Sequence, residues 1–162
     1  MMSVFLDTNV LYSESILDLL RHFQSEGLLR VSISQTVLAE FGRAVGGFTP
    51  LPSLPFTPVG LPDAQDEAIL ADALSSQAQV LLSFNLKDFP VGSIYPLRGL
   101  TPDDWLVENW EVLKDSIERH RQKGPWPEKN EADYAQRLSR ARLFKTRRKL
   151  HPAPDPSSSS SR

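Results

Sequence analysis

Two apolar runs of the chain end directly in side chains that could do chemistry. Residues 4–6 are followed by Asp7, and residues 80–84 are followed by Asn85 and Asp88. Short apolar runs of this kind are typical of strands that are buried on both faces of a parallel sheet. In such sheets, ligands bind beyond the carboxyl ends of the strands. We therefore expect Asp7 and Asp88 to lie at one edge of a parallel sheet.

Two further acids are expected near the same edge. Glu40 is surrounded by apolar positions on one face of a predicted helix over residues 35–45. An unpaired carboxylate on a buried face is costly, so we expect a compensating partner, for which a metal ion is one candidate. Asp66 lies in the first turn of a helix that begins near Asp63, and it projects from the buried face. Helix capping and interaction with the helix dipole are the alternative roles of Asp66.

Four converging carboxylates predict a site for hard divalent cations. Like charges in one place are unfavourable unless cations occupy the site or some acids stay protonated. Oxygen ligands without histidine or cysteine favour Mg²⁺ or Mn²⁺ over zinc. Such ions activate water and stabilise charge on a phosphoryl group, so the chemistry indicated is phosphodiester hydrolysis. The residues expected to carry it are Asp7, Glu40, Asp66 and Asp88.

The elements that must position these acids follow an α/β pattern. Strands are predicted over residues 4–6, 28–33, 80–84 and 94–97, and helices over residues 14–25, 35–45, 64–74, 105–122 and 131–150. Residues 46–62 contain five prolines and three glycines, so we expect a connector without regular structure there. The predicted fold is a three-layer α/β/α sandwich around a mainly parallel sheet. The predicted parts are a domain over residues 1–106, a C-terminal helical extension over 107–150 and a disordered tail over 151–162.

Charge is distributed unevenly along the chain. The formal net charge is only -2, but residues 1–106 hold 12 acids and 5 bases, whereas residues 137–149 hold seven bases and no acid. A basic segment beside an acidic body is compatible with a polyanionic partner such as nucleic acid. A solvated helix face or a dimer contact is the alternative for this segment.

Composition excludes several classes of site and location. The chain has no cysteine, which excludes disulfides and thiolate zinc sites. No stretch is long and apolar enough to span a bilayer, and the N-terminus lacks the pattern of a secretory signal, so we expect a cytoplasmic protein. His22, His120 and His151 are expected on helix surfaces or in the tail, with no matching serine or cysteine. Histidine-based catalysis is therefore not expected.

Taken in order along the chain, these motifs resemble those of PIN-domain ribonucleases. The resemblance covers roughly residues 3–106 and rests on residues 5–11, Glu40, residues 61–66 and residues 82–90. It implies an α/β/α sandwich, a divalent metal and endonucleolytic cleavage of RNA. The site acids that it implies are Asp7, Glu40, Asp66 and Asp88, and the supporting hydrogen-bonding residues are Thr8, Asn9, Ser83 and Asn85.

The resemblance also implies roles and partners. Asp7, Asp66 and Asp88 would bind the essential metal, and Glu40 would hold a second ion or orient the attacking water. Many bacterial relatives are toxins of toxin/antitoxin pairs, so the expected partners are RNA, an antitoxin protein that blocks the site and a second copy of the chain. Basic residues would grip the RNA backbone without sequence preference. They are Arg137, Arg140, Lys145, Arg147 and Arg148.

Other protein classes fit the residues less well. A haloacid-type phosphatase needs a second aspartate two residues after the first, where this chain has Asn9. A response-regulator receiver needs its aspartate after a middle strand and a lysine after a later one, and the order here differs. The stronger alternative is a PIN-like module that binds RNA or protein without cutting. Its best support is the short connector over residues 46–62, where relatives place one or two helices.

Overall fold

The computed structural model describes residues 1–89, 96–124 and 131–152. At its centre is a five-stranded sheet in the order β3-β2-β1-β4-β5, and every pair of neighbouring strands is parallel. This confirms the predicted parallel sheet. The strands are β1 (Met2–Leu6), β2 (Leu29–Ser34), β3 (Thr49–Leu51), β4 (Val80–Leu82) and β5 (Arg98–Leu100).

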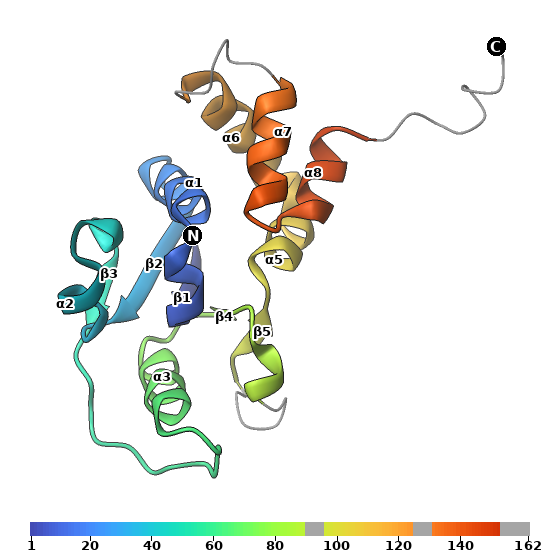
Figure 1. Cartoon of the computed structure of the whole chain (residues 1–162). Helices are drawn as coiled ribbons and strands as arrows, with labels where there is room; N and C mark the ends of the chain where they lie inside the picture. The colour runs from blue at the N-terminus through green and yellow to red at the C-terminus, as the bar shows by residue number, and fades with distance from the viewer. Residues whose placement is uncertain (90–95, 125–130, 153–162) are drawn as a thin grey trace, which may run out of the picture.

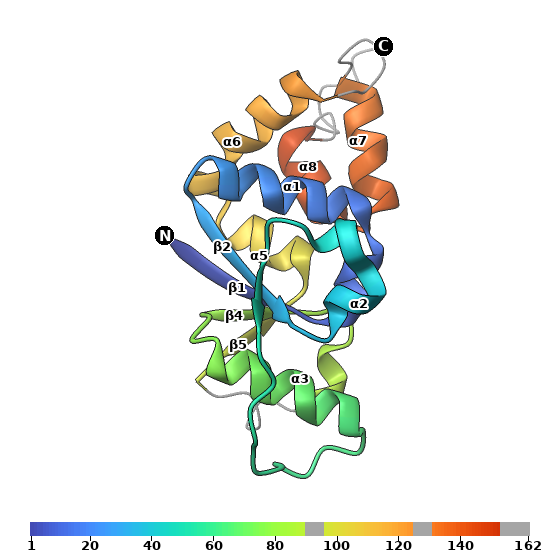
Figure 2. The same cartoon turned by 90° about the vertical axis from the view of Figure 1, so that its left-hand side faces the viewer.

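Helices cover both faces of the sheet. Figure 1 shows α3 below the sheet and α1 and α5 above it, and Figure 2 shows the same layers from the side. The α-helices are α1 (Glu14–Ser25), α2 (Val37–Phe41), α3 (Ala64–Ser75), α5 (Pro102–Glu108), α6 (Trp110–Lys123), α7 (Glu131–Arg140) and α8 (Phe144–Leu150). Short 3-10 helices are η1 (Thr8–Tyr12), η2 (Gly42–Val45) and η3 (Leu86–Asp88). The arrangement is the predicted three-layer α/β/α sandwich with a C-terminal helical part.

Alternate side chains of the central strands belong to two separate cores. Phe5 and Leu81 pack with Leu70 of α3 on one face, whereas Val4 and Leu82 belong to the buried cluster on the other face. This alternation follows from the period of two in a strand. It explains why the strands consist of continuous apolar residues, because both faces are covered.

The C-terminal helices share the core of the sheet. Leu113 of α6 and Tyr134 of α7 are in the same buried cluster as the β1 and β4 side chains. Asp103 of α5 holds α8, since its Oδ1 accepts hydrogen bonds from the Thr146 backbone N–H at 2.9 Å and from Thr146 Oγ1 at 2.7 Å, and its Oδ2 accepts one from the Lys145 N–H at 2.9 Å. The α8 N-terminus is thereby capped from another helix.

The predicted connector contains a strand. Residues 49–51 pair with β2 as β3, so the prediction that residues 46–62 lack regular structure was wrong at this point. Pro50 is compatible with a strand here because β3 lies at the edge of the sheet. The end of the connector is bound to α3. The backbone N–H groups of residues 59–61 donate hydrogen bonds to the carboxylate of Glu67 on that helix. These bonds lower the pKa of Glu67, and the bond from Val59 has the largest effect.

The predicted helix over residues 105–122 is divided at Asn109. The side-chain Nδ2 of Asn109 donates a hydrogen bond to the Trp105 carbonyl oxygen at 2.8 Å. A side-chain amide that bonds a helical carbonyl offers the backbone an alternative to the regular helix. The result is two helices, α5 and α6, that meet at a bend.

The predicted basic helix over residues 131–150 is also divided, at Arg142. Arg142 has a φ of 62°, in the left-handed region. Its N–H donates to the Ser139 carbonyl at 3.0 Å, and the Leu143 N–H donates to the Leu138 carbonyl at 2.9 Å. This pair of bonds is the Schellman arrangement that ends many helices, although glycine usually occupies the left-handed position. The turn buries both leucines.

Two further boundaries differ from the predictions. The last strand lies at Arg98–Leu100 rather than at residues 94–97, of which residues 94 and 95 lie outside the described residues. The helix predicted over residues 35–45 consists of the short α2 followed by η2. Of the predicted tail, residues 153–162 also lie outside the described residues.

Candidate active site

Asp7 and Ser83 lie at the point where the order of the strands reverses. Asp7 follows β1 and Ser83 follows β4, and these two strands are neighbours. From β1 the chain builds the sheet outward through β2 to β3, and it then returns to add β4 and β5 on the opposite side. In open α/β sheets, the crevice beyond the carboxyl ends at such a switch point is the usual place for a ligand.

The buried carboxylate of Asp7 is held by hydrogen bonds from the ends of both strands. Oδ1 accepts one from the Thr8 backbone N–H at 2.7 Å. Oδ2 accepts one from Ser83 Oγ at 2.7 Å and one from Asn9 Nδ2 at 3.1 Å. Ser83 Oγ accepts in turn from the Asn85 N–H at 2.9 Å. Of the four residues predicted to support the site, Thr8, Asn9 and Ser83 therefore bond to Asp7 directly, Thr8 through its backbone, and Asn85 reaches it only through Ser83.

Asp66 and Asp88 bring further negative charge toward Asp7. Burial is the main cause of a raised pKa at Asp7, the charge of Asp88 adds to it, and the hydrogen bonds from Ser83, Thr8 and Asn9 offset part of the effect. The pKa of Asp66 is raised by burial and then by the charges of Asp63, Asp7 and Asp88. Carboxylates from β1, α3 and η3 therefore interact electrostatically, as three of the four predicted site acids were expected to do.

Glu40 lies apart from this group. The prediction that it occupies a buried helix face was wrong, because α2 is little more than one turn long and only Val37 of its residues is buried. Glu40 is exposed. Its Oε1 accepts a hydrogen bond from the Tyr12 hydroxyl at 3.5 Å. Glu40 is not among the charges that raise the pKa of Asp7 or Asp66.

The donor set at the sheet edge is compatible with a hard cation that keeps part of its water shell. Among the described residues, no three His, Cys, Asp or Glu side chains are grouped closely enough to hold a metal ion together. Mg²⁺ usually retains several waters and is bound through only one or two carboxylates. Asp7, Asp66 and Asp88 offer only carboxylate oxygens. Burial first, and neighbouring carboxylates second, raise the pKa of Asp7 and Asp66, and a bound cation would offset both effects.

The turn between α7 and α8 brings arginines to this edge of the molecule. Arg140 and Arg142 line a cavity of about 220 Å³ together with Asn9, Tyr12 and Phe84. The Arg142 guanidinium carbon lies 5.6 Å from the centre of the Phe84 ring, a cation–π arrangement. Sequence reasoning singled out Arg140 but missed Arg142, because nothing local signals where the turn would direct it.

The other predicted RNA contacts are differently placed. Lys145 pairs with Asp104 at 2.6 Å, and Arg147 donates to Ser139 Oγ at 3.0 Å. Arg148 is exposed on α8. These three side chains therefore form part of the α8 surface and do not line the cavity that Arg140 and Arg142 share.

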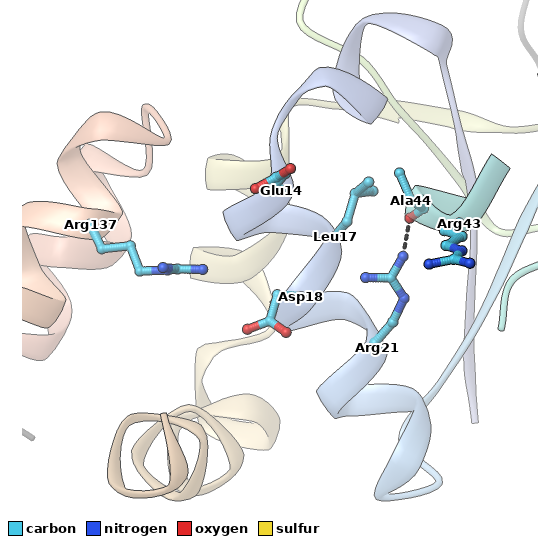
Figure 3. Close-up of a pocket in the computed structure, with 7 residues that line it drawn as sticks. All are labelled: Glu14, Leu17, Asp18, Arg21, Arg43, Ala44 and Arg137. Atoms are coloured by element: carbon cyan, nitrogen blue, oxygen red, sulfur yellow. Dashed lines mark hydrogen bonds between the residues drawn. The ribbon is translucent and has the colours of Figure 1, made fainter. Parts of the chain in front are cut away.

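Arg137 lines a different cavity, of about 440 Å³, beside α1. Figure 3 shows its guanidinium directed toward the side of α1 that carries Glu14 and Asp18. The pKa of Asp18 is lowered chiefly by its hydrogen bond with His120, and the charge of Arg137 lowers it further. On the other side of Leu17, the cavity is lined by Arg21 and Arg43 (Figure 3). The cavity thus mixes both signs of charge, and none of the four predicted site acids lines it.

His120 is buried, so its predicted surface position was wrong. Its Nδ1 lies 2.9 Å from the Tyr134 hydroxyl and its Nε2 lies 2.8 Å from Asp18 Oδ2. These contacts join α6 to α7 and α1. The position supports a structural role for His120 in fixing the C-terminal helices.

Comparison of the chain with protein families, with curated proteins and with solved structures found no match. In the part of the chain that the structure describes, no helix has both the length and the apolar character needed to cross a membrane. The function must therefore be inferred from the side chains at the sheet edge.

Proposed function

We propose that the chain is a divalent-metal-dependent endoribonuclease of the PIN-domain type. The observation that carries this proposal is the group of Asp7, Asp66 and Asp88 at the switch point of the sheet, where burial and mutual charge raise the pKa of the first two. Carboxylates held together against their repulsion are a frequent sign of a site that binds cations or moves protons. The order of the motifs along the chain supports the same assignment.

Mg²⁺ or Mn²⁺ would be held here by one or two of the carboxylates of Asp7, Asp66 and Asp88 directly, and by the remainder through water of its hydration shell. Asp7 Oδ1 accepts one hydrogen bond, so one of its lone pairs is available for ligation. When bound, such an ion stabilises negative charge on the phosphoryl group during hydrolysis. Glu40 is not assigned to the ion, because it is exposed and is not among the charges that raise the pKa of Asp7 or Asp66.

Other residues of the chain would orient the site carboxylate and contact the RNA backbone. Ser83, Asn9 and the Thr8 N–H orient the Asp7 carboxylate. Arg140 and Arg142, with no acid lining their cavity, would contact phosphates of the RNA backbone.

The biological setting that we propose is a toxin/antitoxin pair in the cytoplasm. The support is the resemblance of the motifs around Asp7, Asp66 and Asp88 to those of PIN-domain ribonucleases, many of which are such toxins. An antitoxin would block the enzyme by covering this edge of the sheet.

A second candidate function is a PIN-like module that binds RNA or protein without cutting. The observation that favours it is the spacing of the acids, since among the described residues no three metal-ligating side chains are grouped for one ion. The module would keep the fold and the arginines of the α7–α8 turn but would lack metal-dependent chemistry.

Cleavage of end-labelled single-stranded and structured RNAs distinguishes the two candidates. With Mn²⁺ or Mg²⁺ we expect internal cleavage that chelator abolishes and that Asp7→Asn lowers by at least about 100-fold. Asp115→Asn, which changes an exposed acid on α6, serves as the matched control and should cut normally. RNA binding without cleavage would support the non-catalytic module. Neither binding nor cleavage of RNA, from protein with a normal circular dichroism spectrum, would refute the nuclease and the RNA-binding form of the module.

A further inference from the structure

Two cavities of opposite character meet at Tyr12, the last residue of η1, which begins directly after Asp7. Tyr12 is 71 % exposed, and its ring is supported by Phe41, whose centroid lies 5.2 Å away in an edge-on arrangement. A cavity of about 280 Å³ has Tyr12 in its lining, and so does the arginine-lined cavity of about 220 Å³. Exposed aromatic rings between polar groups are the surfaces on which proteins stack unpaired RNA bases.

The polar lining of the first cavity consists of hydroxyl, amide and carboxylate groups, and no arginine or lysine among the described residues lines it. Its two carboxylates are those of Glu40 and Asp72. Asp72 is buried, and its Oδ2 accepts hydrogen bonds from Ser34 Oγ at 2.8 Å and from Ser53 Oγ at 3.4 Å. Its Oδ1 accepts none from the described residues. We refer to this space as the carboxylate cavity.

Apolar side chains complete the carboxylate cavity. Val37, Ala68 and Ile69 contribute to its lining beside the polar groups. Its volume is slightly below the range of roughly 300–1,000 Å³ that is usual for pockets holding drug-sized ligands. Apolar walls with polar groups between them fit a flat ring system such as one nucleobase. A phosphate is excluded by the repulsion of Glu40 and Asp72.

The second cavity has the opposite charge. Arg140 and Arg142 line it together with Asn9, and no acid among the described residues does. Arg142 also adopts left-handed backbone at a position where glycine is usual. Strain of this kind concentrates at functional sites. A guanidinium pair is suited to a phosphate group, which accepts several charge-assisted hydrogen bonds. We refer to this space as the arginine cavity.

We propose that Tyr12 and the two cavities form a subsite for one guanine nucleotide of single-stranded RNA. The base stacks on Tyr12 in the carboxylate cavity, and an adjacent phosphate lies in the arginine cavity. This inference rests on the proposed ribonuclease function and specifies its substrate: cleavage occurs beside a guanine, because the subsite adjoins Asp7.

Guanine follows from the pattern of hydrogen-bond acceptors. Its Watson–Crick edge carries two adjacent donors, N1–H and the N2 amino group, and the carboxylate oxygens that remain to accept them are Asp72 Oδ1 and those of Glu40. Adenine and cytosine each place an acceptor beside their amino group, and uracil flanks its single donor with two acceptors. Those three bases would therefore direct an acceptor at Glu40 or Asp72.

Binding of short RNAs in the presence of chelator tests the subsite without relying on cleavage. The probes are fluorescein-labelled uridine hexamers in which one central base is G, A, C or U, and the readout is fluorescence anisotropy. We expect the G hexamer to bind about tenfold more tightly than the others, as for one well-formed base contact. Equal affinity for all four hexamers would overturn the proposal.

Asp72→Asn tests the base contact with almost no change of shape. The amide oxygen can accept the bonds from Ser34 and Ser53, while the amide nitrogen places a donor where Oδ1 was. The preference for G should fall to within about twofold, while binding of the U hexamer is unchanged. Glu40→Gln, at an exposed position, is the second variant and should also weaken the preference. Retained preference in both variants would overturn the assignment of guanine to this cavity.

Two substitutions with matched controls test the ring and the arginine cavity. Tyr12→Ala should weaken all four hexamers by about tenfold, because stacking is independent of base identity. Phe144→Ala removes an exposed ring from α8 and should have no effect. Arg142→Gln should weaken binding of all four hexamers equally, and the slope of log affinity against log salt concentration should become shallower by about one. Arg30 is an exposed arginine at the opposite end of β2, and Arg30→Gln should change neither quantity.

The results separate this subsite from the nuclease itself. Metal-dependent cleavage without any base preference would retain the proposed function and overturn the guanine subsite. G-selective binding without cleavage would retain the subsite and refute the nuclease. Cleavage products that end beside G, with selectivity lost in Asp72→Asn, would support both.

Discussion

Single carboxylates at the sheet edge lower the stability of the fold that holds them. Asp66 is the clearest case, because burial and the charges of Asp63, Asp7 and Asp88 all raise its pKa from 3.8. A carboxyl group whose pKa is higher in the folded than in the unfolded chain makes folding less favourable once it is ionised. This cost is complete above the folded-state pKa, and it disappears as the pH falls below 3.8.

Asp66→Asn is therefore expected to stabilise the protein while it removes activity. The urea midpoint should rise at about pH 7, where Asp66 is charged, and should be unchanged at about pH 3, where it is protonated in both states. Asp115→Asn, at an exposed site on α6, should change the free energy of unfolding by less than about 0.5 kcal/mol at either pH. A loss of stability in Asp66→Asn at neutral pH would show that Asp66 makes a favourable contact instead.

At the scale of elements, the turn between α7 and α8 holds Arg142 in a strained backbone conformation and places its side chain in the arginine cavity. The Schellman hydrogen bonds require left-handed backbone at Arg142, where a side chain crowds the backbone and glycine does not. The same turn brings Arg142 over Phe84 and into the arginine cavity. Glycine would adopt this left-handed backbone with less strain, but it would lack the side chain that contacts Phe84 and lines the arginine cavity.

Arg142→Gly should release this strain and weaken RNA binding at the same time. We expect the free energy of unfolding to rise by about 0.5–1 kcal/mol, since the left-handed penalty exceeds the added entropy of the unfolded chain. Gln77, with a φ of 57°, lies between α3 and β4 and provides the matched control. Gln77→Gly should stabilise similarly and leave RNA binding unchanged. Urea denaturation and anisotropy measure the two effects, and a destabilised Arg142→Gly would refute the strain argument.

At the scale of the whole molecule, the topology collects residues that are distant in sequence. Residues 7, 66 and 88 come from three segments, and the arginines at 140 and 142 reach the same edge only because the C-terminal helices pack on the core shared with β1 and β4. The unfolded chain does not hold these groups together. Any ligand of the complete site must therefore stabilise the folded state.

Addition of Mn²⁺ should raise the midpoint of thermal unfolding in a pH-dependent way. Protons compete with the cation for Asp7 and Asp66, and both pKa values are raised. The Mn²⁺-induced shift should therefore be full at neutral pH and should begin to fall, on acidification, at a higher pH than ordinary aspartates would allow. Asp7→Asn should greatly reduce the shift. A shift of equal size in Asp7→Asn would locate the ion elsewhere.

The sequence by itself determined the parts that depend on local patterns. The apolar runs predicted β1 and β4 as strands of a parallel sheet, and the resemblance of the motifs named Ser83 as a supporting residue, which donates to Asp7 in the structure. The spacing of apolar residues predicted α1, and Asp63 caps α3 through the N–H groups of residues 65 and 66 as its type suggests. These features follow from strand and helix periodicity and from hydrogen bonds within a few residues.

Tertiary structure alone decided the rest. Glu40 is exposed because α2 stops after about one turn, and no local signal marks that end. Residues 49–51 become a strand because the edge of β2 is open to pairing. The basic segment bends at Arg142 so that Leu138 and Leu143 can both be buried. Each outcome is set by competition for a shared core or edge between distant segments. The periodicity of a short segment does not show which distant segments will compete with it for the same core or edge. The proposed guanine subsite at Tyr12 is therefore visible only in the folded chain.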